Sequence, residues 1–393
     1  MRRIYIFTGK GGVGKSSVAA AHAMKSAGEG KATLLVSTDM AHNLGDIFER
    51  KLGREIEKQV MPNLDLYEID PDYVMEQDFP FVMEYLEKLF SELGMADMQG
   101  FGVLPGMEEL FSLLKIADIY KKGQYERIFV DCAPTGETLS LLKFPELLSW
   151  YMKKLFPIGK VGVRVLAPIS KAMFQVEMPN RHAMNDIEKM YLKLAELEEL
   201  LKNREITSVR IVTMPEKMVV EETKRNYMYL NLYNFHVDGI YINRILPEDI
   251  NNGFFSQWLS LQKGYLTQIK ECFDGLPIYE IPWYDEELKG EVAISRIVED
   301  VLDGREVFAS RHCSERERFL KSLNGYQLTV SLPYAKKEEI DLYQAATDLV
   351  IRAGNYKRNI PLPNTLCKYM VTAAKLLDGK LYIQFEKGEE ENE

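Results

Sequence analysis

A glycine-rich loop near the start of the chain constrains its fold more than any other feature. The residues Gly9-Lys10-Gly11-Gly12-Val13-Gly14-Lys15-Ser16 fit the pattern GxxxxGK[ST]. An apolar run at Ile4–Thr8 precedes the loop and predicts a buried strand, and an alanine-rich run at Lys15–Ala27 predicts a helix after it. A strand, a glycine loop and a helix in this order predict an α/β domain with a phosphate-binding site where the helix begins.

The parts of this loop have separate predicted tasks. The backbone N–H groups expected to surround the phosphates belong to Gly9, Gly11, Gly12, Val13, Gly14 and Ser17. Lys15 is expected to reach the β- and γ-phosphates, and the Ser16 hydroxyl to ligate Mg²⁺. Lys10 lies at the mouth of the loop, too far forward to repeat the task of Lys15. It is either a solvated surface lysine or a cation that contacts phosphates across a subunit interface.

Further apolar runs predict more strands of the same sheet. They cover Ala32–Thr38, Leu64–Ile69, Tyr125–Asp131, Val209–Thr213 and Val237–Asn243. Such continuous runs are typical of parallel strands that helices cover on both faces. Helical patterns at about 74–120 and 143–205 predict a helical subdomain. For about residues 1–310 the predicted fold is therefore a doubly wound, mostly parallel α/β sheet of the P-loop NTPase type.

Two acidic residues follow buried strands. Asp39 ends the second strand, and Asp131 ends the strand that starts at Tyr125. The carboxyl ends of parallel strands line the ligand crevice of such sheets. Asp39 is therefore a candidate to orient or deprotonate an attacking water, and Asp131 a candidate to bind Mg²⁺, directly or through water. Either acid alone would more often be an ordinary strand-end carboxylate, but together with the loop they form a set.

The pattern changes after about residue 310. Alternation with a period of two at Tyr326–Leu332 and Lys380–Phe385, with turn-rich segments between them, predicts a small antiparallel β-sandwich at about 325–386. Residues 387–393 predict a solvated acidic tail.

Charge, hydropathy and cysteines exclude several classes of protein. The formal net charge of -10 argues against a general nucleic-acid binder. No apolar run is long enough to span a bilayer and no signal-peptide pattern is present, which predicts a cytoplasmic protein. The four cysteines, at positions 132, 272, 313 and 367, form no CxxC pair, so neither zinc nor a disulfide framework is expected.

A basic stretch at 143–183 stands out in this acidic chain. It holds seven Lys or Arg residues, interleaved with aromatic residues and methionines such as Trp150, Met152 and Met173. The stretch predicts either a groove that binds apolar helices or a site that binds an anionic membrane surface. The alternative is a helical layer that simply packs on the sheet.

Taken in order, the motifs resemble those of one ATPase family. The loop through Ser17, the segment Asp39-Met40-Ala41-His42-Asn43 and the segment Asp131-Cys132-Ala133-Pro134-Thr135-Gly136 resemble its deviant Walker A loop, switch I and switch II. That family comprises the arsenite-pump and tail-anchored-protein-targeting ATPases, and the resemblance covers most of residues 1–303. The stretch at about 325–386 resembles the α-crystallin-like domain appended to some bacterial members.

The resemblance implies a homodimer that binds ATP or ADP with Mg²⁺ and opens and closes during hydrolysis. Lys10 would act across the dimer, Asp39 would polarise the water and Asp131 would sense Mg²⁺. Glu216 would approach the nucleotide from the partner, Asn243 would read the adenine, and Pro282 with Trp283 would flank the base. Met40, Cys132 and Glu137 depart from the residues common in the family, which leaves the behaviour of the switches open.

The function predicted is a Mg²⁺-dependent dimeric ATPase whose cycle gates binding of a hydrophobic protein segment or a membrane-protein partner. One alternative is the energising ATPase of an arsenite or antimonite efflux pump, against which the ungrouped cysteines weigh. Others are a Min- or Par-like spatial regulator and a nucleotide-binding module without turnover. The β domain could offer a chaperone-like surface to partners or have a structural role alone.

Overall fold

A computed structural model describes most of the chain as two compact units. The described ranges are 2–39, 43–78, 80, 107–132, 181–250, 253–309, 316–322, 325–345, 348–363, 365–366 and 369–387. The first unit comprises Met1–Ser208 and Tyr284–Val307, and the second comprises Val209–Trp283 and Phe308–Glu393.

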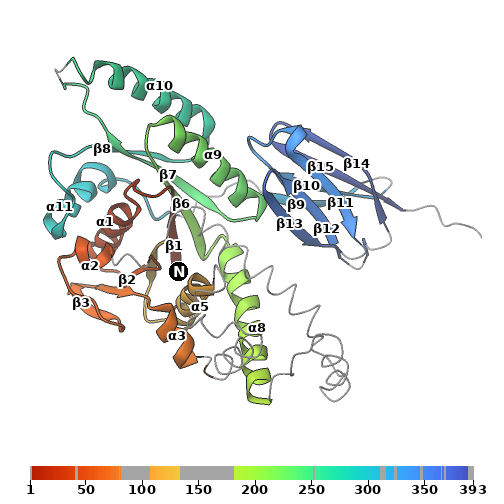
Figure 1. Cartoon of the computed structure of the whole chain (residues 1–393), viewed down its shortest axis with the longest axis horizontal. Helices are drawn as coiled ribbons and strands as arrows, with labels where there is room; N and C mark the ends of the chain where they lie inside the picture. Colours follow the sequence, from red (N-terminus) through yellow and green to blue (C-terminus); the bar gives the residue numbers. More distant parts are fainter. Residues whose placement is uncertain are drawn as a thin grey trace, which may run out of the picture. The chain divides into compact units, whose positions relative to one another are not determined.

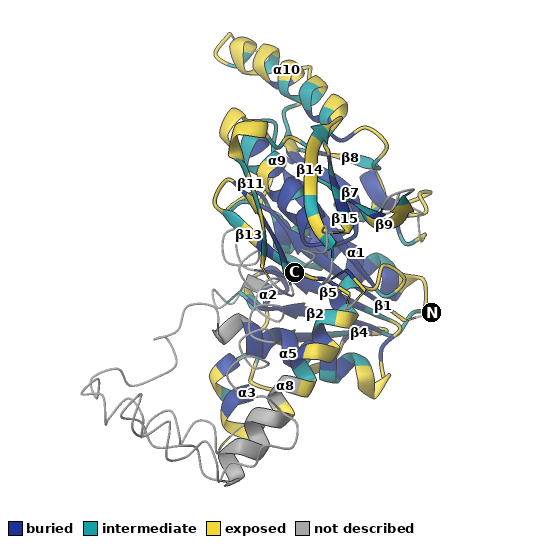
Figure 2. Ribbon diagram, turned by 90° about the vertical axis from the view of Figure 1, so that its right-hand side faces the viewer, coloured by how far each residue is buried: buried dark blue, intermediate teal, exposed yellow. Residues whose placement is uncertain are grey.

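The main sheet confirms the predicted fold class. In the described ranges its strands run in the order β3-β4-β2-β5-β1-β6-β7-β8. The strands of the first unit are β1 (Arg3–Thr8), β2 (Thr33–Ser37), β3 (Glu57–Met61), β4 (Leu64–Glu68) and β5 (Arg127–Asp131). β1 pairs with β5, β5 with β2 and β2 with β4, all in parallel, and β3 adds an antiparallel edge. Every residue of β1 and β2 is buried, as expected for strands covered on both faces (dark blue in Figure 2).

Helices cover this half of the sheet (Figure 1). They are α1 (Lys15–Gly28), α2 (Asn43–Ile47), α3 (Pro71–Asp78), α5 (Met107–Lys122), α8 (Arg181–Lys202) and α11 (Gly290–Ile297), which continues as a π-helical turn at Val298–Leu302. α1 packs on β2 and β5, and α3, α5 and α8 pack on one another in sequence. These last three are the described part of the predicted helical subdomain, and residues 81–106 and 133–180 lie outside the described residues.

The second unit holds the other strands of the main sheet. β6 (Thr207–Thr213), which begins at the boundary, pairs in parallel with β7 (Val237–Ile245), and β7 pairs in parallel with β8 (Ile278–Pro282). α9 (Lys217–Leu232) follows β6, and α10 (Ser256–Cys272) follows β7. α9 is well packed, whereas α10 buries only Gln262 and Ile269 and is largely yellow in Figure 2.

The C-terminal region consists of two antiparallel sheets. One has the strand order β14-β15-β10-β9 and the other β11-β12-β13. Their strands are β9 (Glu317–Ser322), β10 (Gly325–Ser331), β11 (Ile340–Ala345), β12 (Asp348–Ala353), β13 (Tyr356–Pro361), β14 (Tyr369–Leu377) and β15 (Lys380–Lys387), with a 3-10 turn at Lys337–Glu339. The predicted period of two holds, because Leu328, Val330, Ile383 and Phe385 are buried while their neighbours along β10 and β15 are partly exposed.

Two buried arginines join this β region to the end of α9. Arg358 donates to the Leu232 carbonyl (2.6 Å) and pairs with Glu317 (2.6 Å). Arg316 donates to the carbonyls of Phe235 and Val237, just beyond the helix. The last carbonyls of a helix have no partner within it, so the Arg358 guanidinium supplies a donor that the end of α9 lacks, while Arg316 bonds the backbone between α9 and β7. The β region is thus bonded to the α/β part of the second unit.

None of the helices in the described part of the chain is long and apolar enough to cross a membrane.

Candidate functional site

The first unit brings the carboxyl ends of three strands together at the phosphate loop. Asp131 of β5 is in register with Phe7 of β1 and with Ser37 of β2. Beyond the strands, the Thr38 N–H donates to the Asp131 carbonyl (3.0 Å) and the Cys132 N–H to the Phe7 carbonyl (3.3 Å). These bonds extend the sheet by one residue and hold Asp131 and the backbone leading to Asp39 beside the start of the loop.

The loop leaves the N-terminus of α1 available to a ligand. Gly14, the N-cap residue, has φ 89° and ψ 32°, a left-handed conformation that glycine adopts without steric cost. Gly12 also has a positive φ of 79°. α1 has no side-chain cap and no acidic residue in its first turn. Its first N–H groups and its dipole therefore favour an anion, as the sequence predicted for a phosphate site.

The two lysines of the loop differ in their surroundings. Lys15 is buried, and its Nζ donates to the Lys10 carbonyl (3.3 Å), so its side chain folds back over the loop. The Lys15 ammonium therefore lies over the loop, where the sequence predicts that the phosphates bind. Lys10 is partly exposed at the mouth of the loop. Its exposure suits a residue that reaches outward, although it also suits a solvated lysine.

Asp131 is the most perturbed acid of this site. It is fully buried, and neither carboxylate oxygen has a hydrogen bond of ordinary geometry. Burial raises its pKa to about 7, while the nearby Ser16 hydroxyl and the Lys15 ammonium act in the opposite direction. A buried carboxylate without donors, next to a serine hydroxyl, fits a divalent cation bound directly or through water. The residues present therefore suit the Mg²⁺ predicted at Ser16 and Asp131.

Asp39 and the start of switch I also lie at this edge. The Asp39 N–H donates to the Ser37 hydroxyl (3.1 Å), which fixes its backbone. Its charge further raises the pKa of Asp131, so the two carboxylates are within electrostatic reach of each other. α2 is held by Glu68 at the end of β4, which accepts a hydrogen bond from the Gly45 N–H (3.0 Å). Met40, at the departure from the family pattern, lies outside the described residues.

The Cys132 thiol is buried directly after Asp131, and burial raises its pKa to about 12. Cys272 belongs to the second unit and is partly exposed. The described residues contain no group of three or more His, Cys, Asp or Glu side chains that could hold a metal ion.

The other predicted site residues belong to the second unit. Glu216 is exposed and is the N-cap residue of α9, and Pro282 ends β8. Asn243 is buried in β7, where its side-chain oxygen accepts the Arg244 N–H (2.9 Å). The pairing of β7 with β8 is irregular between Ile242 and Ile245, and Arg244 has a positive φ of 56°. Asn243 therefore sits in a strained bulge, of the kind found beside functional sites.

A pocket of about 330 Å³ brings Glu216 and Trp283 together with residues that were not predicted. Its other lining residues are Met214, Pro215, Arg244, Leu246, Phe254, Phe255, Trp258 and Gln262. One sequence signal could have indicated α10, namely the aromatic spacing of Phe254 and Trp258, four residues apart as on one helical face.

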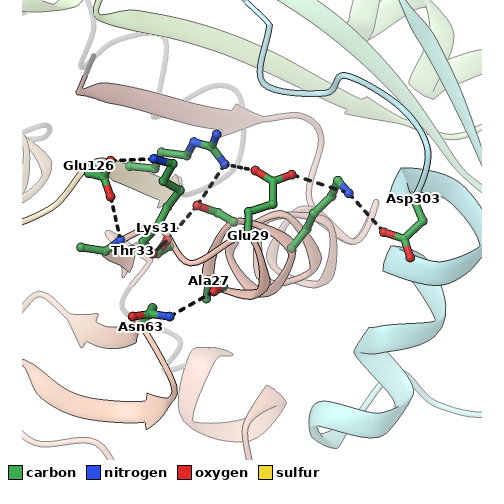
Figure 3. Close-up of polar contacts among 11 residues, drawn as sticks. Ala27, Glu29, Lys31, Thr33, Asn63, Glu126 and Asp303 are labelled. Carbon is green, nitrogen blue, oxygen red and sulfur yellow. Dashed lines mark hydrogen bonds and ion pairs between the residues drawn. The ribbon is translucent and has the colours of Figure 1, made fainter.

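The opposite end of α1 carries a dense polar network, shown in Figure 3. Lys25 pairs with Asp303 (3.1 Å), Arg127 pairs with Glu29 (2.6 Å), and Lys31 pairs with Glu126 (3.0 Å). Behind these ion pairs the Ser26 and Thr33 hydroxyls share a hydrogen bond (2.7 Å), and the Asn63 amide donates to the Ala27 carbonyl (3.3 Å). This network ties α1 to the neighbouring strands and to the end of the π-helical turn.

Glu137 and residues 143–180 of the basic stretch at 143–183 lie outside the described residues, so the predicted client region stays a prediction.

Comparisons with known proteins agree on one family. The model of the anion-transporting ATPase family matches residues 2–303, and the model of the HSP20-like domain found in ArsA matches residues 323–385. Two relatives, whose names describe them provisionally as arsenical pump-driving ATPases, come from Chlorobaculum tepidum and Aquifex aeolicus. The first is 35% identical over 98% of this chain and 96% of its own length, and the second 32% identical over 97% and 99%. ATPase get3 of Pyrenophora tritici-repentis is 29% identical over 75% of this chain and 90% of its own length.

Together with the phosphate loop and the strand-end acids, both family models show that the chain belongs to the anion-transporting ATPase (ArsA) family. It is an ATPase that carries the HSP20-like domain of ArsA proteins.

Proposed function

We propose that the protein is a Mg²⁺-dependent homodimeric ATPase whose nucleotide cycle gates the binding of a hydrophobic protein segment. The observation that supports the ATPase part is made at the start of α1. There the helix N-terminus has no side-chain cap, and Lys15, Ser16 and the buried Asp131, whose carboxylate lacks a hydrogen-bond partner, lie beside it. Bound Mg²⁺ would supply charge neutralisation to the phosphates, held by Ser16 and by Asp131.

The remaining roles follow from position. Lys15 binds the phosphates, and Asp39 orients the attacking water or accepts a proton from it. Lys10, partly exposed at the loop mouth, contacts the phosphates bound by the partner subunit. Asn243 and the segment around Pro282 and Trp283 hold the adenine, and Glu216 senses nucleotide from the partner side. The order of these motifs along the chain supports these assignments.

The hydrophobic client is proposed from two features. The basic stretch at 143–183 combines cationic residues with flexible methionines and aromatic residues, a composition suited to varied apolar helices. The resemblance also extends to ATPases that target tail-anchored proteins. The metalloid-efflux alternative is favoured by the names of the two bacterial relatives. It is disfavoured by the cysteines, which form no group in the sequence, and by the burial of the Cys132 thiol.

Subunit complementation tests the dimeric mechanism. Lys10→Ala and Asp39→Asn are each expected to bind nucleotide and to lose turnover. If Lys10 acts across the dimer and Asp39 within its own subunit, a mixed dimer has one complete site. Random exchange of equal amounts should then restore about a quarter of the wild-type ATPase rate. A cis-acting Lys10 would give no recovery, and full turnover by a monomeric Lys10→Ala protein would refute the mechanism.

The control is Lys31→Ala, which removes a partly exposed lysine at the other end of α1 and should leave the rate unchanged. An apolar-helix peptide then tests the client proposal, since binding should differ between the ATP- and ADP-loaded wild type. Equal binding in both states, together with stimulation of turnover by arsenite or antimonite, would favour the efflux alternative.

A further inference from the structure

One row of residues across the main sheet links the phosphate loop to the segment that follows β2. Phe7 of β1 is in register with Asp131 of β5. Asp131 is in register with Ser37 of β2, and Ser37 with Glu68 of β4. Residues in register on neighbouring parallel strands point to the same face of the sheet. Since the Phe7 ring packs against His22 of α1 (ring centroids 5.1 Å apart), the row lies on the face that α1 covers.

Two members of this row hold the two ends of the segment 39–45, which begins switch I and runs into α2. The Ser37 hydroxyl accepts a hydrogen bond from the Asp39 N–H (3.1 Å), and the Glu68 carboxylate accepts one from the Gly45 N–H (3.0 Å). Ser37 and Glu68 lie roughly 5 Å apart, the spacing of neighbouring strands. The Ile69 N–H donates to the Ser37 carbonyl (3.1 Å), which joins the two strands at this point. Both ends of the segment are therefore bonded to the same edge of the sheet.

The contact between Glu68 and Gly45 leaves α2 little room to move. Glu68 is 8% exposed, so its charge-assisted hydrogen bond is shielded from bulk water. The Gly45 carbonyl in turn accepts the Arg50 N–H (2.9 Å), which closes the end of α2. A Cβ on Gly45 would lie 2.8 Å from the Arg50 carbonyl oxygen, closer than packing allows. Both backbone polar groups of Gly45 are thus bonded, and only glycine fits between them without a shift of the backbone.

Strand β4 offers an internal comparison. Asp65, three residues before Glu68, also accepts a backbone hydrogen bond, from the Gln59 N–H (2.7 Å). That bond fastens the edge strand β3, which takes no part in the phosphate site. Glu68 makes the same kind of bond at the other end of the strand, in one row with Asp131. The two carboxylates differ in the segment that they hold, so a comparison of the two separates support of the fold from support of the reaction.

We propose that Glu68 is a positioning residue for ATP hydrolysis, which acts by holding Gly45 and thereby the place of Asp39. The inference rests on the proposed function, because it requires that Asp39 orients the attacking water. Only residues 40–42 separate Asp39 from α2 in the chain, so a displaced α2 would pull on Asp39. A misplacement of about 1 Å in a group that orients a reactant can lower the rate by as much as about 100-fold. Loss of Glu68 should therefore lower kcat and spare nucleotide binding.

Steady-state ATPase assays and ADP titrations of the full-length protein test the proposal. Glu68→Ala removes the acceptor and should lower kcat about 10-fold or more, with the Kd for ADP and Mg²⁺ within about twofold of wild type. Glu68→Gln keeps an oxygen at the same reach and should retain at least about a third of the wild-type kcat. Asp65→Ala is the matched control, because it removes the same kind of bond from the same strand. It should lower the urea midpoint but leave kcat within about twofold.

A transition-state analogue separates positioning from a general loosening of the fold. ADP with aluminium fluoride and Mg²⁺ imitates the phosphoryl group during transfer, so its binding follows kcat more closely than ADP binding does. Glu68→Ala should weaken binding of this analogue by about the factor lost in kcat, whereas Asp65→Ala should bind it like wild type. Glu68→Asp provides a further variant if Glu68→Ala does not fold. It keeps the charge but withdraws the carboxylate by one methylene group, and it should show the same paired loss.

Asp39→Asn, assayed beside these variants, separates this inference from the proposed function. If Asp39→Asn abolishes turnover and the Glu68 variants lose kcat together with analogue binding, with recovery in Glu68→Gln, Glu68 is a positioning residue. If Asp39→Asn abolishes turnover but Glu68→Ala hydrolyses ATP like wild type, the inference is wrong and the ATPase mechanism stands. Equal losses of kcat in Asp65→Ala and Glu68→Ala, or no recovery in Glu68→Gln, would contradict it in the same way. Wild-type turnover by Asp39→Asn would overturn both.

Discussion

The two ends of α1 differ in whether their polar groups have partners within the protein. At Lys15 the helix begins with a left-handed glycine, no side-chain cap and an adjacent buried carboxylate that has no donor. At Gly28 the same helix ends among three ion pairs and a shared hydroxyl bond, as Figure 3 shows. One end holds groups whose partners must come from a ligand, and the other satisfies its groups within the protein. Substitutions at the first end are therefore expected to change ligand binding and its dependence on pH. Substitutions at the second end are expected to change the stability of the fold alone.

A pair of lysine variants on this helix gives the largest expected contrast. Lys15→Ala removes the cation from the phosphate site and should lower kcat/KM by roughly 100-fold or more. Lys25→Ala, ten residues further along the same helix, removes the partner of Asp303 and should leave kcat/KM within about twofold. Steady-state ATPase assays measure both. Equal losses in the two variants would erase the distinction between the ends.

Asp131→Asn should stabilise the nucleotide-free protein at alkaline pH. The folded-state pKa of about 7 lies above the ordinary aspartate value of 3.8, so ionisation is unfavourable in the fold. This group therefore costs stability progressively as pH rises from about 4 to about 7, with the full cost above that range. The variant should gain on the order of 3 kcal/mol over wild type at pH 8 and far less at pH 5. Urea titrations at both pH values measure this, and the same gain at each would contradict it.

Arg127→Met tests the other end of the helix. It removes the ion pair with Glu29 and a hydrogen bond to Ser26, while the methionine keeps much of the apolar stem. Loss of stability should be about 1–2 kcal/mol, with KM for ATP unchanged. Denaturant midpoints and ATPase kinetics on the same preparation decide the matter. A raised KM would show that the network also tunes the nucleotide site.

Lys31→Ala should have the smallest effect. Both members of the Lys31–Glu126 pair are nearly half exposed, and Glu126 also accepts a hydrogen bond from the Ala32 N–H. Exposed pairs contribute little, so the melting temperature should move by less than about 1 °C, and less still in high salt. Calorimetry at two salt concentrations checks this. A salt-independent drop of several degrees would mean that the pair is more strongly coupled than its exposure indicates.

Sequence reasoning succeeded where function and fold depend on adjacent residues. The strand, glycine loop and helix around Lys15 are contiguous, so their pattern predicts the local geometry directly. β3 was not predicted, because Glu57–Met61 is mostly exposed and polar. It is held by Asp65, whose carboxylate accepts the Gln59 N–H (2.7 Å) and pairs with Lys58 (2.8 Å). Such a strand depends on its neighbour and carries no apolar signal of its own.

The contacts of the two buried arginines could not be predicted from the sequence, for a different reason. Arg316 and Arg358 come from a region that reads as a separate β domain, and arginine is rarely buried. Their acceptors at Leu232, Phe235 and Val237 are about a hundred residues away in sequence. Only the folded arrangement shows that Arg358 bonds the last carbonyl of α9 and that Arg316 bonds the backbone that follows this helix.

The arginine contacts at and beyond the end of α9 make this helix depend on the C-terminal region. Once Arg316 and Arg358 supply the donors for these carbonyls, deletion of the β region would remove both at one stroke and uncover Tyr229, which packs against Tyr356. Loss of the whole region would therefore be expected to destabilise α9 itself, whereas single substitutions within the region would each remove only one of these contacts.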